Sequence, residues 1–109
     1  MGLAASQARF LGLTARKSDL ELQGQFINQA RMYLANITGQ LFTVSTNLEP
    51  DSPQAIQINL RIQAFAQIDK MLEMQLRRVD SQREAVQTEI EAVQKVIQKN
   101  IVGTFKTFG

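Results

Sequence analysis

The stretch LEPDSPQA, residues 48–55, contains both prolines of this 109-residue chain. A proline lacks the amide proton that a helix interior uses, and it disfavours helical geometry in the residue before it. Ser52 is a residue type favoured at a helix N-cap, and Pro53 suits the first helical position that follows. We therefore predict a hairpin turn made of Pro50, Asp51, Ser52 and Pro53, after which a second helix begins.

A seven-residue repeat of apolar side chains precedes the turn. Its members are Leu13, Leu20, Ile27, Leu34, Leu41 and Leu48, and three of them are followed three residues later by Ala30, Ile37 and Val44. Residues at this spacing follow one side of a helix, in the pattern of a coiled-coil seam. The repeat predicts a first helix over residues 3–48, followed by the turn at 49–52.

A second repeat of the same length follows the turn, in a segment with no glycine or proline from residue 54 until Gly103. Its apolar residues are Phe65, Leu72, Val79, Val86 and Val93, with Leu76, Ile90 and Ile97 four residues after three of them, and with Arg83 as a polar interruption. This repeat predicts a second helix over about residues 53–105. Because short connections join antiparallel neighbours, we predict a single all-α hairpin over residues 1–109. Its predicted intramolecular seam consists of Leu20, Ile27, Leu34, Leu41, Leu48, Phe65, Leu72, Val79, Val86 and Val93.

The residue content points away from catalysis. The chain contains no Cys and no His, which removes thiol nucleophiles, disulfides, His-based triads and zinc sites of the Cys/His type. Asp69 with Glu73, and Asp80 with Glu84, are acidic pairs one helical turn apart, but their basic neighbours favour surface charge over a metal site. The common phosphate-binding and nucleophile motifs do not occur. We predict a protein that is not an enzyme and uses no cofactor.

Nucleic-acid and membrane partners are also disfavoured. The formal net charge is only +2 and the basic residues are scattered, whereas nucleic-acid binding normally uses a basic stripe or a known motif. No apolar run approaches the roughly 20 residues that cross a bilayer. Residues 3–13 could lie on a membrane surface, but the polar face there is mostly Ser, Gln and Thr rather than basic. We predict no nucleic-acid partner and no stable membrane insertion.

The chain contains more apolar residues than one seam can use. Leu3, Phe10, Leu22, Phe26, Met32 and Tyr33 lie off the first repeat, and the second helix carries further apolar residues on several faces. In an antiparallel hairpin the two ends of the chain lie together, and a large apolar patch there usually marks an interaction site. The predicted assembly interface consists of Leu3, Phe10, Leu13, Ile97, Ile101, Val102, Phe105 and Phe108. We therefore expect a homo-oligomer in which hairpins pack into a higher-order helical assembly.

The order of long helix, PDSP turn and long helix, with VQKVIQKNIVGTFKTF at residues 93–108, resembles the needle subunits of type III secretion systems. LANI, residues 34–37, resembles the N-terminal helix of flagellar rod and hook proteins. The needle resemblance implies a small hairpin that is exported without a cleaved signal and assembles into a hollow tube. It places Ile97, Ile101 and Phe105 at the assembling end. Because this chain is longer than typical needle subunits at both ends, we expect the broader class of helical filament subunits.

Two functions remain open at this point. The first is a structural subunit of a bacterial secretion-linked or extracellular filament, exported to the cell surface or beyond without a cleaved Sec signal, since Arg9 interrupts the apolar start of the chain. A secretion chaperone or the base of a secretion system would then be a further partner. The second is a coiled-coil adaptor or secretion chaperone, which would be cytoplasmic and form a small closed oligomer that binds a partner protein.

Overall fold

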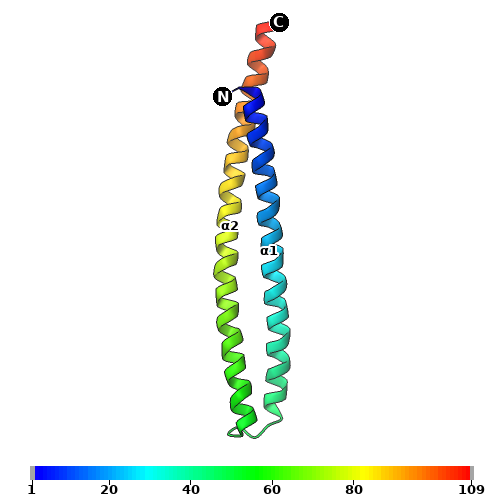
Figure 1. Ribbon diagram of the computed structural model, residues 1–109, viewed down its shortest axis with the longest axis vertical. Helices are drawn as coiled ribbons and strands as arrows, with labels where there is room; N and C mark the ends of the chain where they lie inside the picture. Colours follow the sequence, from blue (N-terminus) through cyan, green and yellow to red (C-terminus); the bar gives the residue numbers. More distant parts are fainter. Residues whose placement is uncertain (1, 109) are drawn as a thin grey trace. The chain divides into compact units, whose positions relative to one another are not determined.

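The computed structural model describes residues 2–108, apart from the side chains of residues 105, 107 and 108. Helix α1 spans Leu3–Thr46 and helix α2 spans Pro53–Phe108. The two helices pack antiparallel as a hairpin (Figure 1). The all-α hairpin predicted from the sequence is therefore confirmed.

The hairpin divides into two compact units, each formed by a segment of α1 and a segment of α2. The terminal unit comprises Met1–Gln23 and Val79–Gly109, and the turn unit comprises Gly24–Arg78. The heptad repeats run through both units and predicted one hairpin without this division. The units differ in how completely the two helices cover the seam.

Helix α1 ends at Thr46, two residues before the predicted end at Leu48. The hydroxyls of Thr43, Ser45 and Thr46 donate hydrogen bonds to carbonyls three or four residues earlier, at 3.0, 2.8 and 2.7 Å. Such bonds compete with the helical ladder, and branched side chains weaken it further. The amides of Asn47 and Leu48 then bond carbonyls three residues back, the tighter pattern that closes a helix.

Helix α2 begins at Pro53, where the sequence predicts a helix start. The Ser52 hydroxyl accepts a hydrogen bond from the Ala55 amide at 3.2 Å, and the Ser52 carbonyl accepts one from the Ile56 amide at 3.1 Å. Ser52 is therefore the N-cap of α2. Pro53 occupies the first helical position, where no intrahelical partner exists for an amide proton. The predicted turn lies within the connection formed by residues 47–52 and the first residue of α2.

The terminal unit contains most of the buried seam. Its buried hydrophobic side chains are 4–7 % exposed and come from both helices: Leu20, Val79, Val86, Ile90 and Val93. All five belong to the two repeats seen in the sequence. Full burial of side chains of this type contributes roughly 1.5–3 kcal/mol each, so this seam is the main stabilising contact of the terminal unit.

The turn unit leaves its seam incompletely covered. Among its described residues, Ala55 is the one buried hydrophobic residue, at 2 % exposure. The neighbouring seam positions Arg31, Thr38 and Asp69 are polar and half-buried, so water reaches the apolar side chains beside them. The predicted seam residues of this unit are all half-buried: Ile27, Leu34, Leu41, Leu48, Phe65 and Leu72.

The prediction that Val44 completes the α1 side of the seam is wrong. Val44 is 48 % exposed, although Ala30 and Ile37, which precede it in the same series, are half-buried. The inner positions lie one residue further along the chain, four residues after successive members of the leucine repeat. They are occupied by half-buried polar or small residues: Lys17, Gly24, Arg31, Thr38 and Ser45. The series Ala30, Ile37 and Val44 therefore forms the edge of the seam.

Ser6 is fully buried, at 0 % exposure, and its hydroxyl has no hydrogen-bond partner among the described residues. Its position, seven residues before Leu13, continues the leucine repeat. An unpaired buried hydroxyl is destabilising, because folding removes its water without replacing the lost bond. We expect Ser6→Ala to raise the free energy of unfolding by about 1–2 kcal/mol, measured by urea unfolding with circular dichroism.

Ser18→Ala is the matched control for this change, because Ser18 is exposed on the same helix. It should show only the gain in helix propensity, about 0.5 kcal/mol. Equal gains in the two variants would show that the Ser6 hydroxyl carries no burial cost.

Candidate interaction surface

Fifteen large hydrophobic side chains of the described residues are exposed, against six hydrophobic residues that are buried. Five of the exposed side chains lie in the terminal unit: Leu11, Leu22, Val96, Ile101 and Val102. Ten lie in the turn unit: Phe26, Met32, Tyr33, Phe42, Val44, Ile56, Leu60, Ile68, Met71 and Met74. Apolar surface of this extent is typical of a protein that binds another protein.

The assembly interface predicted at the ends of the chain is only partly exposed. Ile101 and Val102 are 48 and 52 % exposed. The side chains of Phe105 and Phe108 lie outside the described residues. The four remaining members are half-buried: Leu3, Phe10, Leu13 and Ile97. Ile101 and Val102 are therefore the described part of this predicted interface that is open to a partner.

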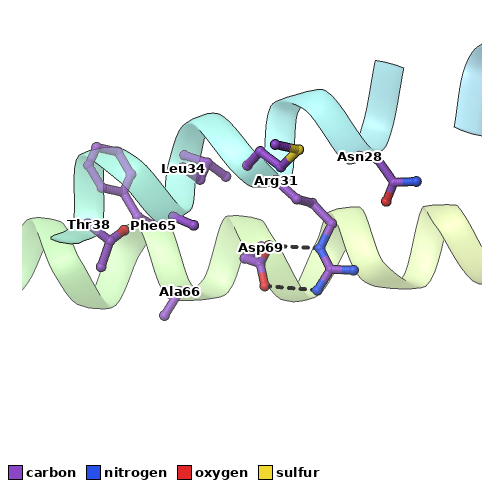
Figure 2. A pocket seen from close by; sticks show the side chains of 9 residues that line it. Asn28, Arg31, Leu34, Thr38, Phe65, Ala66 and Asp69 are labelled. Carbon is purple, nitrogen blue, oxygen red and sulfur yellow. Dashed lines mark hydrogen bonds and ion pairs between the residues drawn. The ribbon is translucent and has the colours of Figure 1, made fainter. Parts of the chain in front are cut away.

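An ion pair joins the two helices inside the turn unit (Figure 2). Arg31 of α1 donates hydrogen bonds from Nε and Nη2 to the two carboxylate oxygens of Asp69 on α2, at 2.9 and 3.2 Å. This forked geometry is the strong form of an arginine–carboxylate contact. The pair lies in a groove that is lined by Asn28, Arg31, Met32, Leu34, Ala35, Thr38, Phe65, Ala66 and Asp69.

This ion pair was not predicted from the sequence, although a signal for it was present. Asp69 stands four residues after Phe65, in the series in which Arg83 was recognised as a polar interruption. Arg31 likewise stands four residues after Ile27. Two interruptions of opposite charge at seam positions of antiparallel helices indicate a bridge between them.

Hydrogen bonding to Arg31 lowers the pKa of Asp69 below its usual range, although partial burial acts in the opposite direction. The contribution of Asp69 to stability is therefore complete above the ordinary carboxyl pKa, about 4, and is lost as the pH falls through the lowered value. We expect Asp69→Asn to lower the thermal unfolding midpoint equally from about pH 5 to pH 8. The difference from wild type should shrink as the pH falls below about 4, because protonation of Asp69 removes the charge that pairs with Arg31.

Thermal unfolding followed by circular dichroism over this pH range tests the ion pair. Asp80→Asn is the matched control, because it removes an exposed carboxylate from the same helix. A midpoint difference for Asp69→Asn that does not shrink as the pH is lowered would mean that lost packing, rather than lost charge pairing, causes the effect.

One face of α1 in the turn unit carries a continuous row of apolar residues, here called the outer stripe. It consists of Phe26, Ala30, Tyr33, Ile37 and Val44, at intervals of four, three, four and seven residues, which keep side chains on one side of a helix. Phe26, Tyr33 and Val44 are 58, 67 and 48 % exposed. Ala30 and Ile37 are half-buried at the edge of the seam, so the stripe extends the apolar seam outward.

The α1 segment that carries the outer stripe is nearly free of charge. Between Gly24 and Leu48, Arg31 is the only charged residue, and it is paired with Asp69. Amide side chains supply much of the polar surface of this segment, among them Gln25, Asn28, Gln29, Asn36 and Gln40. An amide side chain both donates and accepts hydrogen bonds, so it can pair with a second amide.

The terminal unit has a groove of a different character. Lys17 of α1 and Arg83 of α2 line it together with Glu84, Gln87 and Thr88, and both cations are half-buried. The Nζ atom of Lys17 lies 4.0 Å from the Oε1 atom of Glu21, on the same helix. The interruption of the repeat at Arg83 on α2 therefore lies in the same groove as a second basic seam residue, Lys17 on α1.

The first acidic pair considered from the sequence, Asp69 with Glu73, has other partners in the structure. Asp69 binds Arg31, and Glu73 accepts a hydrogen bond from Arg77 at 2.7 Å. Within residues 2–108 no group of three or more acidic side chains is placed to hold a metal ion. Across the same residues, neither helix contains a stretch apolar enough to span a membrane.

The fold and the exposed surface together define the class of protein: an antiparallel helical hairpin with more apolar surface than its own two helices cover. Comparison of the chain with protein-family models, with curated proteins and with solved structures gives no match. The exposed apolar surface is therefore the feature from which a function can be inferred.

Proposed function

We propose that the chain is a structural subunit that self-assembles by helix packing into a filament or tube of a bacterial secretion-linked or extracellular kind. The observation that supports this proposal is that, among the described residues, fifteen large hydrophobic side chains are exposed and only six hydrophobic residues are buried. Exposing so much apolar surface costs solubility, and packing against further copies removes it from water.

An open polymer requires that each subunit make at least two contacts that do not close on themselves. The chain offers exposed apolar residues in two different units. Ile101 and Val102 belong to the terminal unit, and the outer stripe belongs to the turn unit. Contacts made by two different surfaces of each copy propagate an assembly, whereas a single self-complementary surface stops at a dimer.

The resemblance of the PDSP turn and the C-terminal helix to secretion needle subunits supports the same proposal. By that resemblance the subunit would be exported without a cleaved signal and would act at the cell surface or outside the cell. A secretion chaperone or the base of the secretion system would bind it before assembly.

Negative-stain electron microscopy of the concentrated protein, alongside light scattering, tests the proposal. Uniform filaments are expected, with scattering that grows with protein concentration. A monodisperse dimer or tetramer at every concentration would contradict the filament and favour the adaptor or secretion-chaperone function. The next experiment in that case would be to identify the partner protein.

Removing residues 102–109 is expected to abolish the polymer while leaving helical content largely intact. The deletion removes the exposed Val102 and the last turns of α2, but none of the buried seam residues. Electron microscopy and circular dichroism measure the two effects. Val102→Gln, which keeps the helix and removes one exposed apolar side chain, should weaken assembly less. Polymers that are unchanged by the deletion would exclude the C-terminal end as an assembly contact.

A further inference from the structure

We infer that the outer stripe of the turn unit docks against the outer stripe of a second copy of this chain, with the two α1 helices antiparallel. This inference deepens the proposed function, on which it rests for the nature of the partner, because it names one of the contacts between copies. It differs from the sequence prediction, which placed assembly at the chain ends.

The turn unit has an unfinished apolar core that a further helix would complete. Ala55 is the one buried hydrophobic residue among its described residues, and the large seam side chains are half-buried. Ala30 and Ile37 connect the seam to the exposed Phe26, Tyr33 and Val44. A helix laid on the outer stripe would therefore cover the exposed residues and one edge of the seam.

The second copy is the occupant that the charge distribution favours. A two-fold contact brings two patches of identical net charge together, so a patch with unpaired charges of one sign would repel its own copy. Between Gly24 and Leu48 the only charge is Arg31, which is paired with Asp69 in a groove that also contains Met32. A strongly charged partner would find no complementary charge on this segment, whereas an identical segment meets no repulsion.

Four members of the stripe, Phe26, Tyr33, Ile37 and Val44, are spaced seven, four and seven residues apart, which is the same in either direction; Ala30 falls opposite Gln40. A two-fold axis at the level of Ala35 places Phe26 opposite Val44 of the second copy and Tyr33 opposite Ile37 of the second copy. Each aromatic ring then faces a smaller aliphatic side chain, which allows two helices to interdigitate. A parallel arrangement would place Phe26 against Phe26 of the second copy, and Tyr33 against Tyr33 of the second copy. Large side chains would then meet at the same level.

The expected contact is small. Burial of a whole aromatic side chain removes about 150–250 Å² from water, and Phe26 and Tyr33 are 58 and 67 % exposed. Together they supply about 200–300 Å² of the roughly 800 Å² that each partner contributes to a standard interface. The aliphatic members and the neighbouring amides add further area, but the contact stays smaller than a standard interface. We therefore expect a dimer with a dissociation constant in the micromolar range.

Sedimentation equilibrium of the dilute 109-residue chain tests the surface with two adjacent residues of matched exposure. Tyr33 is 67 % exposed on the outer stripe, and Met32 is 68 % exposed and lines the Arg31–Asp69 groove. We expect Tyr33→Glu to weaken self-association at least tenfold, and Met32→Glu to change it less than threefold. Circular dichroism should show equal helical content. Equal weakening by both variants, or none by Tyr33→Glu, would overturn the inference.

Disulfide cross-linking tests the orientation, since the chain contains no cysteine and single substitutions supply the only thiols. A mixture of Phe26→Cys and Val44→Cys chains should form a mixed disulfide dimer under mild oxidation, and neither variant alone should do so. Cross-linking of each variant alone without the mixed product would overturn the antiparallel contact.

The cross-link and the filament report separately on the two proposals. A mixed disulfide in a protein that forms no filaments would support the dimer contact and contradict the filament function. Filaments in wild type without any mixed disulfide at positions 26 and 44 would support the filament function and overturn the dimer contact.

Discussion

Leu20→Ala is expected to lower the free energy of unfolding by about 3 kcal/mol, within the 2–5 kcal/mol range measured for buried leucines. Leu20 is 5 % exposed in the seam of the terminal unit, so truncation leaves a cavity as well as removing apolar contact. Leu34→Ala is the matched comparison, at an equivalent position of the same repeat in the turn unit. Because Leu34 is half-buried, its truncation should cost about half as much.

Urea unfolding followed by circular dichroism measures both values, at a protein concentration low enough to keep association out of the equilibrium. A larger cost for Leu34→Ala than for Leu20→Ala under these conditions would contradict the different coverage of the two seams. The two variants should also be measured at high protein concentration. If a second molecule then covers the turn unit, the loss in free energy of unfolding should grow for Leu34→Ala and stay the same for Leu20→Ala.

Ile90→Asp is expected to have a larger effect, and to lower the free energy of unfolding by roughly 3–5 kcal/mol at pH 7 or to prevent folding of the terminal unit. Ile90 is 6 % exposed among other apolar seam residues, so the introduced carboxylate would lose its water without gaining a partner. Desolvation raises the pKa of a buried carboxyl, and the destabilisation should therefore become smaller as the pH falls below the raised value.

Helical content, measured against temperature from about pH 3 to pH 8, shows the effect. Ala92→Asp is the control, because Ala92 is exposed two residues further along the same helix. A similar loss of thermal stability in Ile90→Asp and Ala92→Asp would contradict the assignment of Ile90 to the buried seam. If the loss of stability in Ile90→Asp does not decrease at low pH, then disturbed packing, rather than the buried charge, is its cause.

The sequence was sufficient to predict the elements of this fold. Two repeats of seven residues require helices, and Pro50 and Pro53 require an interruption between them. The start of α2 followed from Ser52 and Pro53, whose local chemistry suits an N-cap and the position after it. The end of α1 was predicted two residues late, because Leu48 is apolar and continues the repeat. The hydroxyl side chains of Thr43, Ser45 and Thr46 already weaken the helix before that position.

The interaction surface was less accessible to prediction. Apolar residues in excess of one seam were evident from the sequence, but their division into covered and exposed members was not. Leu3, Phe10 and Leu13 were assigned to an external interface and are half-buried. Phe26 and Tyr33 were recognised as off-seam residues, yet Val44 was assigned to the seam and so the outer stripe was not assembled.

The sequence by itself determined which segments are helical, to within two or three residues at their ends, and where the chain reverses, because periodicity, capping and proline geometry act within a few residues of one another. Only the tertiary structure decided which side chains are covered. Coverage depends on the rotation of each helix about its axis and on the register between the helices. Both depend on contacts between distant residues, such as Arg31 with Asp69 and Arg9 with Glu89. For that reason the structure, rather than the repeat, locates the outer stripe in the turn unit.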